Sequence, residues 1–172
     1  MMWSKIKKNI ESNFSEKLKD KIQIYTTTYT KNYDSGDLSN RGWITVNGKE
    51  VVNFSTPDSF RLNSYVYNFT TPTNFITAEK VTIEERSPEQ LTEKGEFSKF
   101  DLSNCCYAFL EMSIEEGLNH ESPIINMLSV LDKRLGKRRL LKLNDQNLHP
   151  LVKYFLNLRL EAENIKINNI TE

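Results

Sequence analysis

The stretch SPIINMLSVLDKRLGKRRLLKL, residues 122–143, contains a helix start, an apolar face, a glycine and the densest positive charge in the chain. Ser122 can accept a hydrogen bond from a free backbone N–H at a helix start, and Pro123 has no N–H to leave unpaired there. Gly136 can take the left-handed conformation that ends a helix. The pattern predicts a helix over residues 122–135, with these apolar residues on one face: Ile124, Ile125, Leu128, Leu131 and Leu135.

The residues around Gly136 predict a tight corner between this helix and a second, shorter one. Asp132, Lys133 and Arg134 fall outside the apolar face, so we expect them to face water. Beyond the glycine, a second apolar face alternates with basic residues and consists of Leu140, Leu141 and Leu143. We call residues 132–142 the basic corner.

Charge is segregated along the chain although the formal net charge is zero. The segment 133–142 has six basic residues and no acidic one, whereas the segment 84–121 has ten acidic residues against three basic ones. These charges can neutralise each other within the fold, or the basic corner can face outward toward an anionic partner. The candidate surface for either role comprises Arg134, Lys137, Arg138, Arg139 and Lys142.

The arginines of the basic corner favour the first of these two roles. A guanidinium group makes paired contacts with a carboxylate, and a corner between packed helices brings neighbouring side chains within reach. We predict that at least Arg134 or Arg138 is partly buried in an ion pair within the chain. Lys137 and Lys142 are predicted to be exposed.

Composition indicates one ordinary domain, residues 1–172. The chain has 172 residues, of which 38% are hydrophobic and 27% charged, which suffices for one core. Zero net charge argues against a dedicated nucleic-acid-binding or membrane-surface protein. Because the start of the chain has no signal-peptide pattern and no segment approaches the roughly 20 apolar residues of a membrane span, we expect a cytoplasmic protein. Adjacent Cys105 and Cys106 are expected to be buried and unpaired.

Apolar periodicity divides the chain into helical and strand-forming parts. Residues 1–21 have an amphipathic helical pattern, and residues 22–75 are mainly strand-forming. Asn47-Gly48 suits the two-residue turn of a β-hairpin between strands 42–46 and 49–54. Residues 76–168 are mainly helical, so we predict an α+β fold with an N-terminal helix, a three- or four-stranded antiparallel meander and a C-terminal helical bundle.

Individual helices can be placed in the C-terminal half. The expected helices span residues 77–86, 87–95, 100–118 and 122–135, and a last helix begins near Pro150. The conformation of residues 55–75 stays open, because their many aromatic residues have no regular period.

The search for chemistry finds no catalytic or cofactor motif. Phosphate-binding, dinucleotide-binding and zinc-protease patterns are absent, so we expect no cofactor and no metal site. A Glu116–His120 pair is the only acid–base candidate, and neither a nucleophile nor a metal partner is marked beside it. Enzymatic activity is therefore uncertain, and the sequence favours its absence.

Five segments together resemble a family of small uncharacterised bacterial proteins. The family has no established activity, so the resemblance implies a bacterial cytoplasmic setting and assigns no functional residue. The segments are Met2–Lys8, Trp43–Val46 with Lys49–Val51, Met112–Leu118 and Asp132–Leu140.

Two functional hypotheses follow from these observations. The first is a protein-binding protein, for example an immunity-type partner that neutralises a toxin domain, because segregated charge can steer association. The alternative is a small enzyme or nucleic-acid-associated factor with a site near the basic corner. An enzyme requires a concave site where carboxylates or histidines converge, whereas a binding protein requires a broad exposed patch. The sequence leaves the partner and the oligomeric state undetermined.

Overall fold

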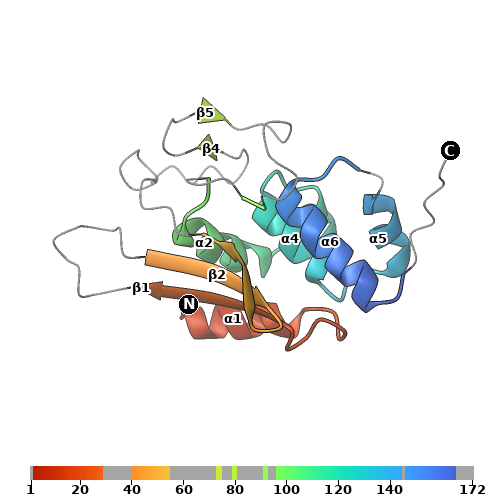
Figure 1. The fold of residues 1–172 in the computed structure, drawn as a ribbon, viewed down its shortest axis with the longest axis horizontal. Helices are drawn as coiled ribbons and strands as arrows, with labels where there is room; N and C mark the ends of the chain where they lie inside the picture. Colours follow the sequence, from red (N-terminus) through yellow and green to blue (C-terminus); the bar gives the residue numbers. More distant parts are fainter. Residues whose placement is uncertain are drawn as a thin grey trace.

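The computed structural model describes residues 2–28, 40–54, 73–74, 79–80, 91–92, 96–144 and 146–165. An N-terminal helix precedes an antiparallel sheet, and helices follow (Figure 1), which confirms the α+β class. In chain order the elements are α1 (Trp3–Ser12), β1 (Ile22–Thr28), β2 (Asn40–Val46), β3 (Lys49–Asn53), β4 (Thr73–Asn74), β5 (Glu79–Lys80), α2 (Lys99–Phe109), α3 (Ile114–Leu118), α4 (Pro123–Leu131), α5 (Lys137–Asn144) and α6 (Pro150–Ala162).

The sheet is a three-stranded antiparallel meander with the strand order β1-β2-β3. Asn47 and Gly48 have φ values of 51° and 78°, so both turn residues adopt the positive φ expected for this hairpin. Ile24 pairs with Ile44, which pairs with Val52, and all three are buried on the inner face. The predicted hairpin and meander are confirmed.

Two helices cover the sheet. From α1, Ile6 and Ile10 pack into the core, and α1 also contacts both β1 and α2. Helix α2 packs against β2 at Gly42, where an added Cβ would lie 3.0 Å from Leu102. The glycine therefore permits this close approach between helix and strand.

Helix α4 lies at the centre of the helical half and contacts α2, α3 and α6. Eight of its nine residues are buried, and Leu128 and Leu131 are both fully buried as expected. A single cluster of buried apolar side chains runs from the sheet through α2 and α4 to α6. The two halves thus share one core.

The chain between α1 and β1 packs against the end of α4. Helix α1 ends at Ser12, so the helical pattern over residues 1–21 continues as turns after that point. Phe14 forms a β-bridge with Asp132, the Ser15 N–H donates to the Leu131 carbonyl at 2.8 Å, and the Lys133 N–H donates to the Asn13 carbonyl at 2.8 Å. This contact joins the N-terminal segment to the basic corner.

Two expected helices differ in the structure. The helix predicted over residues 100–118 is divided into α2 and α3, because Ser113 accepts from the Glu116 N–H and the Glu116 carboxylate accepts from the Ser113 N–H, which starts a new helix. Within the helix predicted over residues 77–86, Glu79–Lys80 pairs as strand β5 with β4 instead. The remainder of that segment lies outside the described residues, as do 55–72 and most of 87–95.

The helix predicted over residues 122–135 is shorter in the structure, where α4 spans Pro123–Leu131. Helix α4 ends at Leu131, because Asp132 adopts an extended conformation and joins the bridge to Phe14. Gly136 therefore does not end this helix; its carbonyl accepts from the Leu140 N–H at the start of α5. The Ser122 hydroxyl does not cap α4 either, and lies 3.5 Å from the buried Cys105 sulfur.

Candidate functional site

Asp132 is the buried centre of the basic corner, contrary to the expectation that it faces water. Its carboxylate accepts three hydrogen bonds from Arg134: the backbone N–H and the Nε–H donate to Oδ1 at 2.8 and 3.0 Å, and a terminal N–H donates to Oδ2 at 2.9 Å. The side chain of Asp132 is 1% exposed. Since a buried carboxylate is costly without paired donors, Arg134 makes the burial of Asp132 possible.

Arg134 also connects the basic corner to the segment between α2 and α3. A terminal N–H donates to the Met112 carbonyl at 3.1 Å, and the guanidinium carbon lies 5.5 Å from the centre of the Phe109 ring. The Arg134 side chain is 41% exposed. The predicted partly buried ion pair is therefore found at Arg134, although its carboxylate comes from the corner itself.

Arg159 of α6 binds the backbone of the basic corner and of the end of α4. The sequence analysis did not identify this residue. Its guanidinium donates to the carbonyls of Val130, Asp132 and Leu135 at 2.8, 2.5 and 2.7 Å, and its Nε–H donates to Glu163 at 2.8 Å. The residue is 2% exposed. A buried arginine thus donates to one carbonyl in the last turn of α4, that of Val130, and to two carbonyls in the chain after this helix, those of Asp132 and Leu135.

The outward face of α5 presents the remaining charges of the corner. Arg138 and Lys142 lie four residues apart, and both are exposed, as is Lys137. Arg139 pairs with Glu115 at 2.5 Å across an exposed contact. Within the described part of the chain, Lys137, Arg138 and Lys142 form no ion pair, so this face is a surface of uncompensated positive charge.

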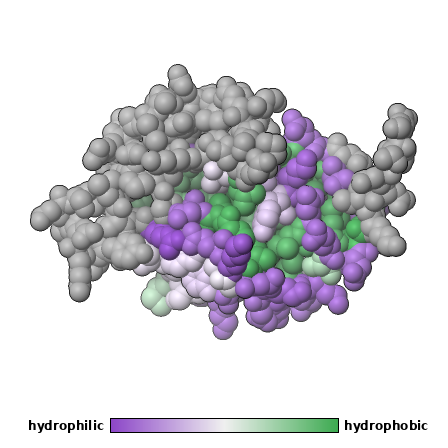
Figure 2. Space-filling view, viewed as in Figure 1, coloured by the Kyte–Doolittle hydropathy of each residue, from purple (hydrophilic) through white to green (hydrophobic). Residues whose placement is uncertain are grey.

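Figure 1 places α5 at the outer end of the helical half, where it contacts α6 and buries Leu140. Figure 2 shows hydrophilic residues along the outer and lower rim of this half. An exposed, charged helix face suits contact with another macromolecule rather than enclosure of a small substrate.

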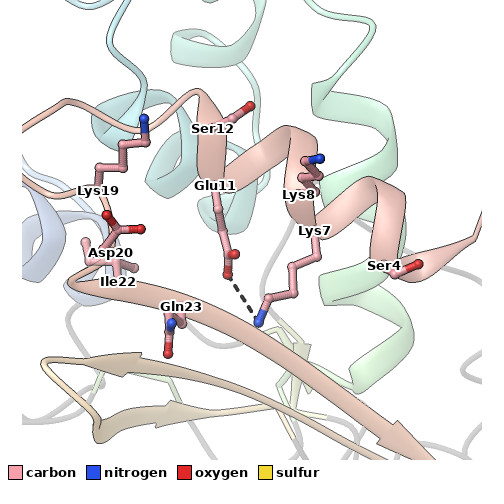
Figure 3. Close-up of a pocket in the computed structure, with 9 residues that line it drawn as sticks. All are labelled: Ser4, Lys7, Lys8, Glu11, Ser12, Lys19, Asp20, Ile22 and Gln23. Carbon is pink, nitrogen blue, oxygen red and sulfur yellow. Dashed lines mark ion pairs between the residues drawn. The ribbon is translucent and has the colours of Figure 1, made fainter.

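A concavity of about 610 Å³ lies elsewhere, between α1 and β1 (Figure 3). The Glu11 carboxylate near its centre is already engaged: it accepts from the Ile24 N–H at 2.8 Å and lies 3.4 Å from the Lys7 ammonium. Lys8 and Lys19 point away from this pair. Among the described residues, the concavity therefore contains one ion pair, whose carboxylate is also bound by a backbone N–H, and no set of cations converging on one anion.

Comparison with protein families assigns the chain. The model of the SF0329 protein family matches residues 2–160. The chain belongs to this family. No curated protein and no solved structure matches the chain. Membership of the SF0329 family agrees with the resemblance to an uncharacterised family, and it adds no activity, ligand or partner.

The two histidines of this SF0329-family chain have structural roles. The His149 ring accepts from the Leu151 N–H at Nδ1, 3.1 Å, so its Nε2 carries the proton and donates to the buried Glu96 carboxylate at 3.1 Å. His120 accepts from the Ser122 N–H at 2.9 Å. Hydrogen bonds with Ser113 lower the pKa of Glu116 and hold its carboxylate at the start of α3. The described residues contain no Glu116–His120 hydrogen bond.

Both cysteines of the SF0329-family chain are buried and form no disulfide. Burial raises the pKa of the Cys105 thiol to about 12 and raises the pKa of Cys106 as well. In the described segments, no group of three His, Cys, Asp or Glu side chains is arranged to hold a metal ion. None of the helices described here has the length and apolar character needed to cross a bilayer. The surface that stands out is the outward face of α5.

Proposed function

We propose that this protein is a bacterial, cytoplasmic, non-catalytic binding protein that docks an acidic surface of a partner protein on the outward face of α5. The observation that carries the proposal is the charge arrangement of α5, Lys137–Asn144, which has four basic residues and no acidic one. Three of the four stand in its first turn: Lys137, Arg138 and Arg139.

This arrangement opposes the stability of the helix itself. The first turn of a helix has unpaired N–H groups and a partial positive charge, so cations there are unfavourable. Arg138 and Lys142 repel each other across one turn, because side chains four residues apart are neighbours. Charges that a helix would be more stable without are expected where they serve binding.

The finer form of the proposal is an immunity-type protein that neutralises a toxin domain. Such a protein must associate rapidly, and complementary charge raises the rate of productive encounter. A toxin-like gene immediately upstream of the gene for this chain would support this form, and a neighbourhood without any such gene would count against it.

The test reverses charge on α5 alone. The variant combines Arg138→Glu with Lys142→Glu, and the matched control combines Lys49→Glu with Lys153→Glu, two exposed lysines outside the corner. Tagged wild-type and variant proteins are used to isolate partners from cells at low and high salt. We expect a protein partner that the wild type and the control retain at low salt, that the α5 variant loses and that high salt releases.

The nucleic-acid alternative has its own arm in the same experiment. Binding of a fluorescent DNA duplex and a fluorescent single strand is measured by anisotropy for all three proteins. Tight binding that only the α5 variant loses would replace the proposed protein partner with nucleic acid. Identical protein partners for the wild type and the α5 variant would exclude α5 as the docking surface.

A further inference from the structure

An acidic surface borders the basic corner, on α3 and on the segment that precedes this helix. We call it the acidic edge, and its three exposed residues are Glu111, Glu115 and Glu116. The ion pair between Arg139 and Glu115 joins the first turn of α5 to the first turn of α3 at 2.5 Å. Arg134 donates to the Met112 carbonyl, one residue after Glu111, at 3.1 Å. Positive and negative charge therefore lie side by side at the surface.

The charges of the two surfaces are only partly paired within the chain. Among the described residues, Arg139–Glu115 is the one ion pair that connects the acidic edge to α5, and Glu111 and Glu116 form none. The outward face of α5 likewise keeps three exposed cations without a carboxylate partner in the described part of the chain. Each surface is therefore available to complement the other on a second molecule.

Adjacent surfaces of opposite charge are self-complementary when two copies of a chain meet about a two-fold axis, because each contact then occurs twice. If the axis passes near the Arg139–Glu115 pair, a half turn places the outward face of α5 of each copy on the acidic edge of the other. Cations then meet carboxylates in both halves of the contact, and like charges stay apart.

The overall charge of the chain permits this approach. Its 23 basic and 23 acidic residues give a formal net charge of zero, so two copies do not repel each other at long range. Proteins whose net charge is near zero are also the most prone to associate. Repulsion between whole molecules therefore does not oppose the local attraction between α5 and the acidic edge.

We propose that two copies of this chain form a weak two-fold dimer, in which the outward face of α5 of each copy docks on the acidic edge of the other. This inference rests on the proposed function in that both use the same face of α5. The dimer regulates that face, because a second copy covers it until an acidic partner displaces the copy. Since the contact consists of exposed charges, it is weak and sensitive to salt.

Self-association of the full chain is measured first, by sedimentation equilibrium over about a hundredfold range of concentration at low and high salt. We expect monomers at low concentration, dimers at high concentration in low salt, and dissociation of the dimers in high salt. Monomers at every concentration in low salt contradict the proposal. Species that continue to grow beyond a dimer contradict it as well, because a two-fold contact closes on itself.

Charge reversal on each surface then shows whether α5 and the acidic edge meet. The α5 variant is Arg138→Glu with Lys142→Glu. The edge variant is Glu111→Lys with Glu115→Lys, which keeps the Glu116 carboxylate that starts α3. The control is Lys49→Glu with Lys153→Glu, and circular dichroism checks the folding of all three proteins. We expect the α5 and edge variants each to weaken dimerisation at least about tenfold, and the control to change it by less than about threefold.

An equimolar mixture of the α5 variant and the edge variant is the decisive sample. The α5 variant has carboxylates on both surfaces and the edge variant has cations on both, so each repels its own copies and attracts the other. We expect mixed dimers whose dissociation constant lies within about threefold of the wild-type value. A mixture that stays monomeric, or a single variant that dimerises as tightly as the wild type, overturns the proposal.

These measurements separate the dimer from the proposed partner. A wild-type chain that stays monomeric and still retains a protein partner through α5 excludes the dimer and leaves the proposed function in place. A wild-type chain that dimerises as expected but retains no protein partner excludes the proposed function and leaves the dimer in place.

Discussion

The buried guanidinium of Arg159 donates hydrogen bonds to backbone carbonyls at the end of α4 and just after it, where the core excludes water. Arg159 occupies the position on α6 one turn beyond the buried Phe155, where a leucine would otherwise be expected. Its donors reach the Val130 carbonyl in the last turn of α4 and the Asp132 and Leu135 carbonyls after it, and the Asp132 carbonyl also accepts from the Leu135 N–H at 3.0 Å. The guanidinium therefore replaces water at a helix end that the fold encloses.

Replacement of Arg159 tests this role directly. Arg159→Met keeps the volume and removes every donor, so the Val130, Asp132 and Leu135 carbonyls each lose a hydrogen bond. The Asp132 carbonyl keeps its bond from the Leu135 N–H, and the Glu163 carboxylate keeps its bond from the Ser15 hydroxyl. We expect a loss of about 3–5 kcal/mol in the free energy of unfolding, measured with urea. Arg138→Met, an exposed control, should change it by no more than about 0.5 kcal/mol. Similar values for the two variants would contradict the role of Arg159.

The cysteines give a second prediction at the residue scale. A thiol reacts as its thiolate, and burial raises the pKa of Cys105 to about 12, so almost no thiolate forms at neutral pH. We expect neither Cys105 nor Cys106 to react with a disulfide reagent at pH 8 in the folded protein, and both to react in urea. Rapid modification of the native protein would show that these thiols are accessible.

At the scale of elements, Gly117 allows α3 to lie against α4. A Cβ at position 117 would meet the Ser129 hydroxyl at 2.4 Å and the Phe109 ring at 3.0 Å, whereas a Cβ at Gly136 meets nothing within 4 Å. Gly117→Ala should therefore lower the free energy of unfolding by about 1–3 kcal/mol. Gly136→Ala, the control, should change it by about 0.5 kcal/mol or less. Thermal unfolding of both variants distinguishes packing from a general effect of adding a methyl group.

Helix α5 should gain stability when it loses its charge. Arg138→Glu places a carboxylate in the first turn, four residues before Lys142, where both the helix dipole and the opposite charge favour it. We expect a gain of about 0.3–1 kcal/mol in the free energy of unfolding at low salt, together with weaker partner binding. If Arg138→Glu instead lowers the free energy of unfolding and also weakens partner binding, Arg138 stabilises the fold and the loss of binding follows from that.

Short sequence patterns correctly predicted the β2–β3 hairpin and the start of α6. Asn47-Gly48 fixes the hairpin, and Pro150 marks the start of α6, because each acts through its own backbone preference. The end of α4 was mispredicted, since apolar spacing continued to Leu135 while the bridge between Phe14 and Asp132 ended the helix at Leu131. That bridge joins residues 118 positions apart, and spacing along the chain contains no information about it.

The sequence predicted which basic residues form the basic corner, but it did not predict which of the corner's side chains are buried. A run of basic residues identified the corner, and the exposure of Lys137 and Lys142 agrees with the prediction. The burial of Asp132 was missed, because an aspartate outside an apolar face normally meets water. Arg159 did leave a signal in the sequence, as a lone cation on the inner face of α6 with Glu163 one turn later.

At the scale of the whole molecule, two kinds of contact among the described residues join the sheet to the helical half. Buried apolar side chains form one cluster across both, and the segment after α1 forms a bridge and backbone hydrogen bonds with the end of α4. Helices α1 and α2 contact each other as well as the sheet, so unfolding of one half would expose apolar side chains of the other. We therefore expect the chain to unfold as one cooperative unit.

A core substitution far from the sheet tests this cooperativity. Leu128 of α4 is fully buried, and Leu128→Ala should lower the free energy of unfolding by about 2–5 kcal/mol. In a Trp3→Phe background, the remaining tryptophan is Trp43 of β2, so fluorescence reports the sheet while far-ultraviolet circular dichroism is dominated by the helices. If the chain is one unit, the urea transitions from the two probes coincide and Leu128→Ala shifts both by the same amount. A helical signal that shifts while the Trp43 transition stays in place would instead establish two independently folding halves.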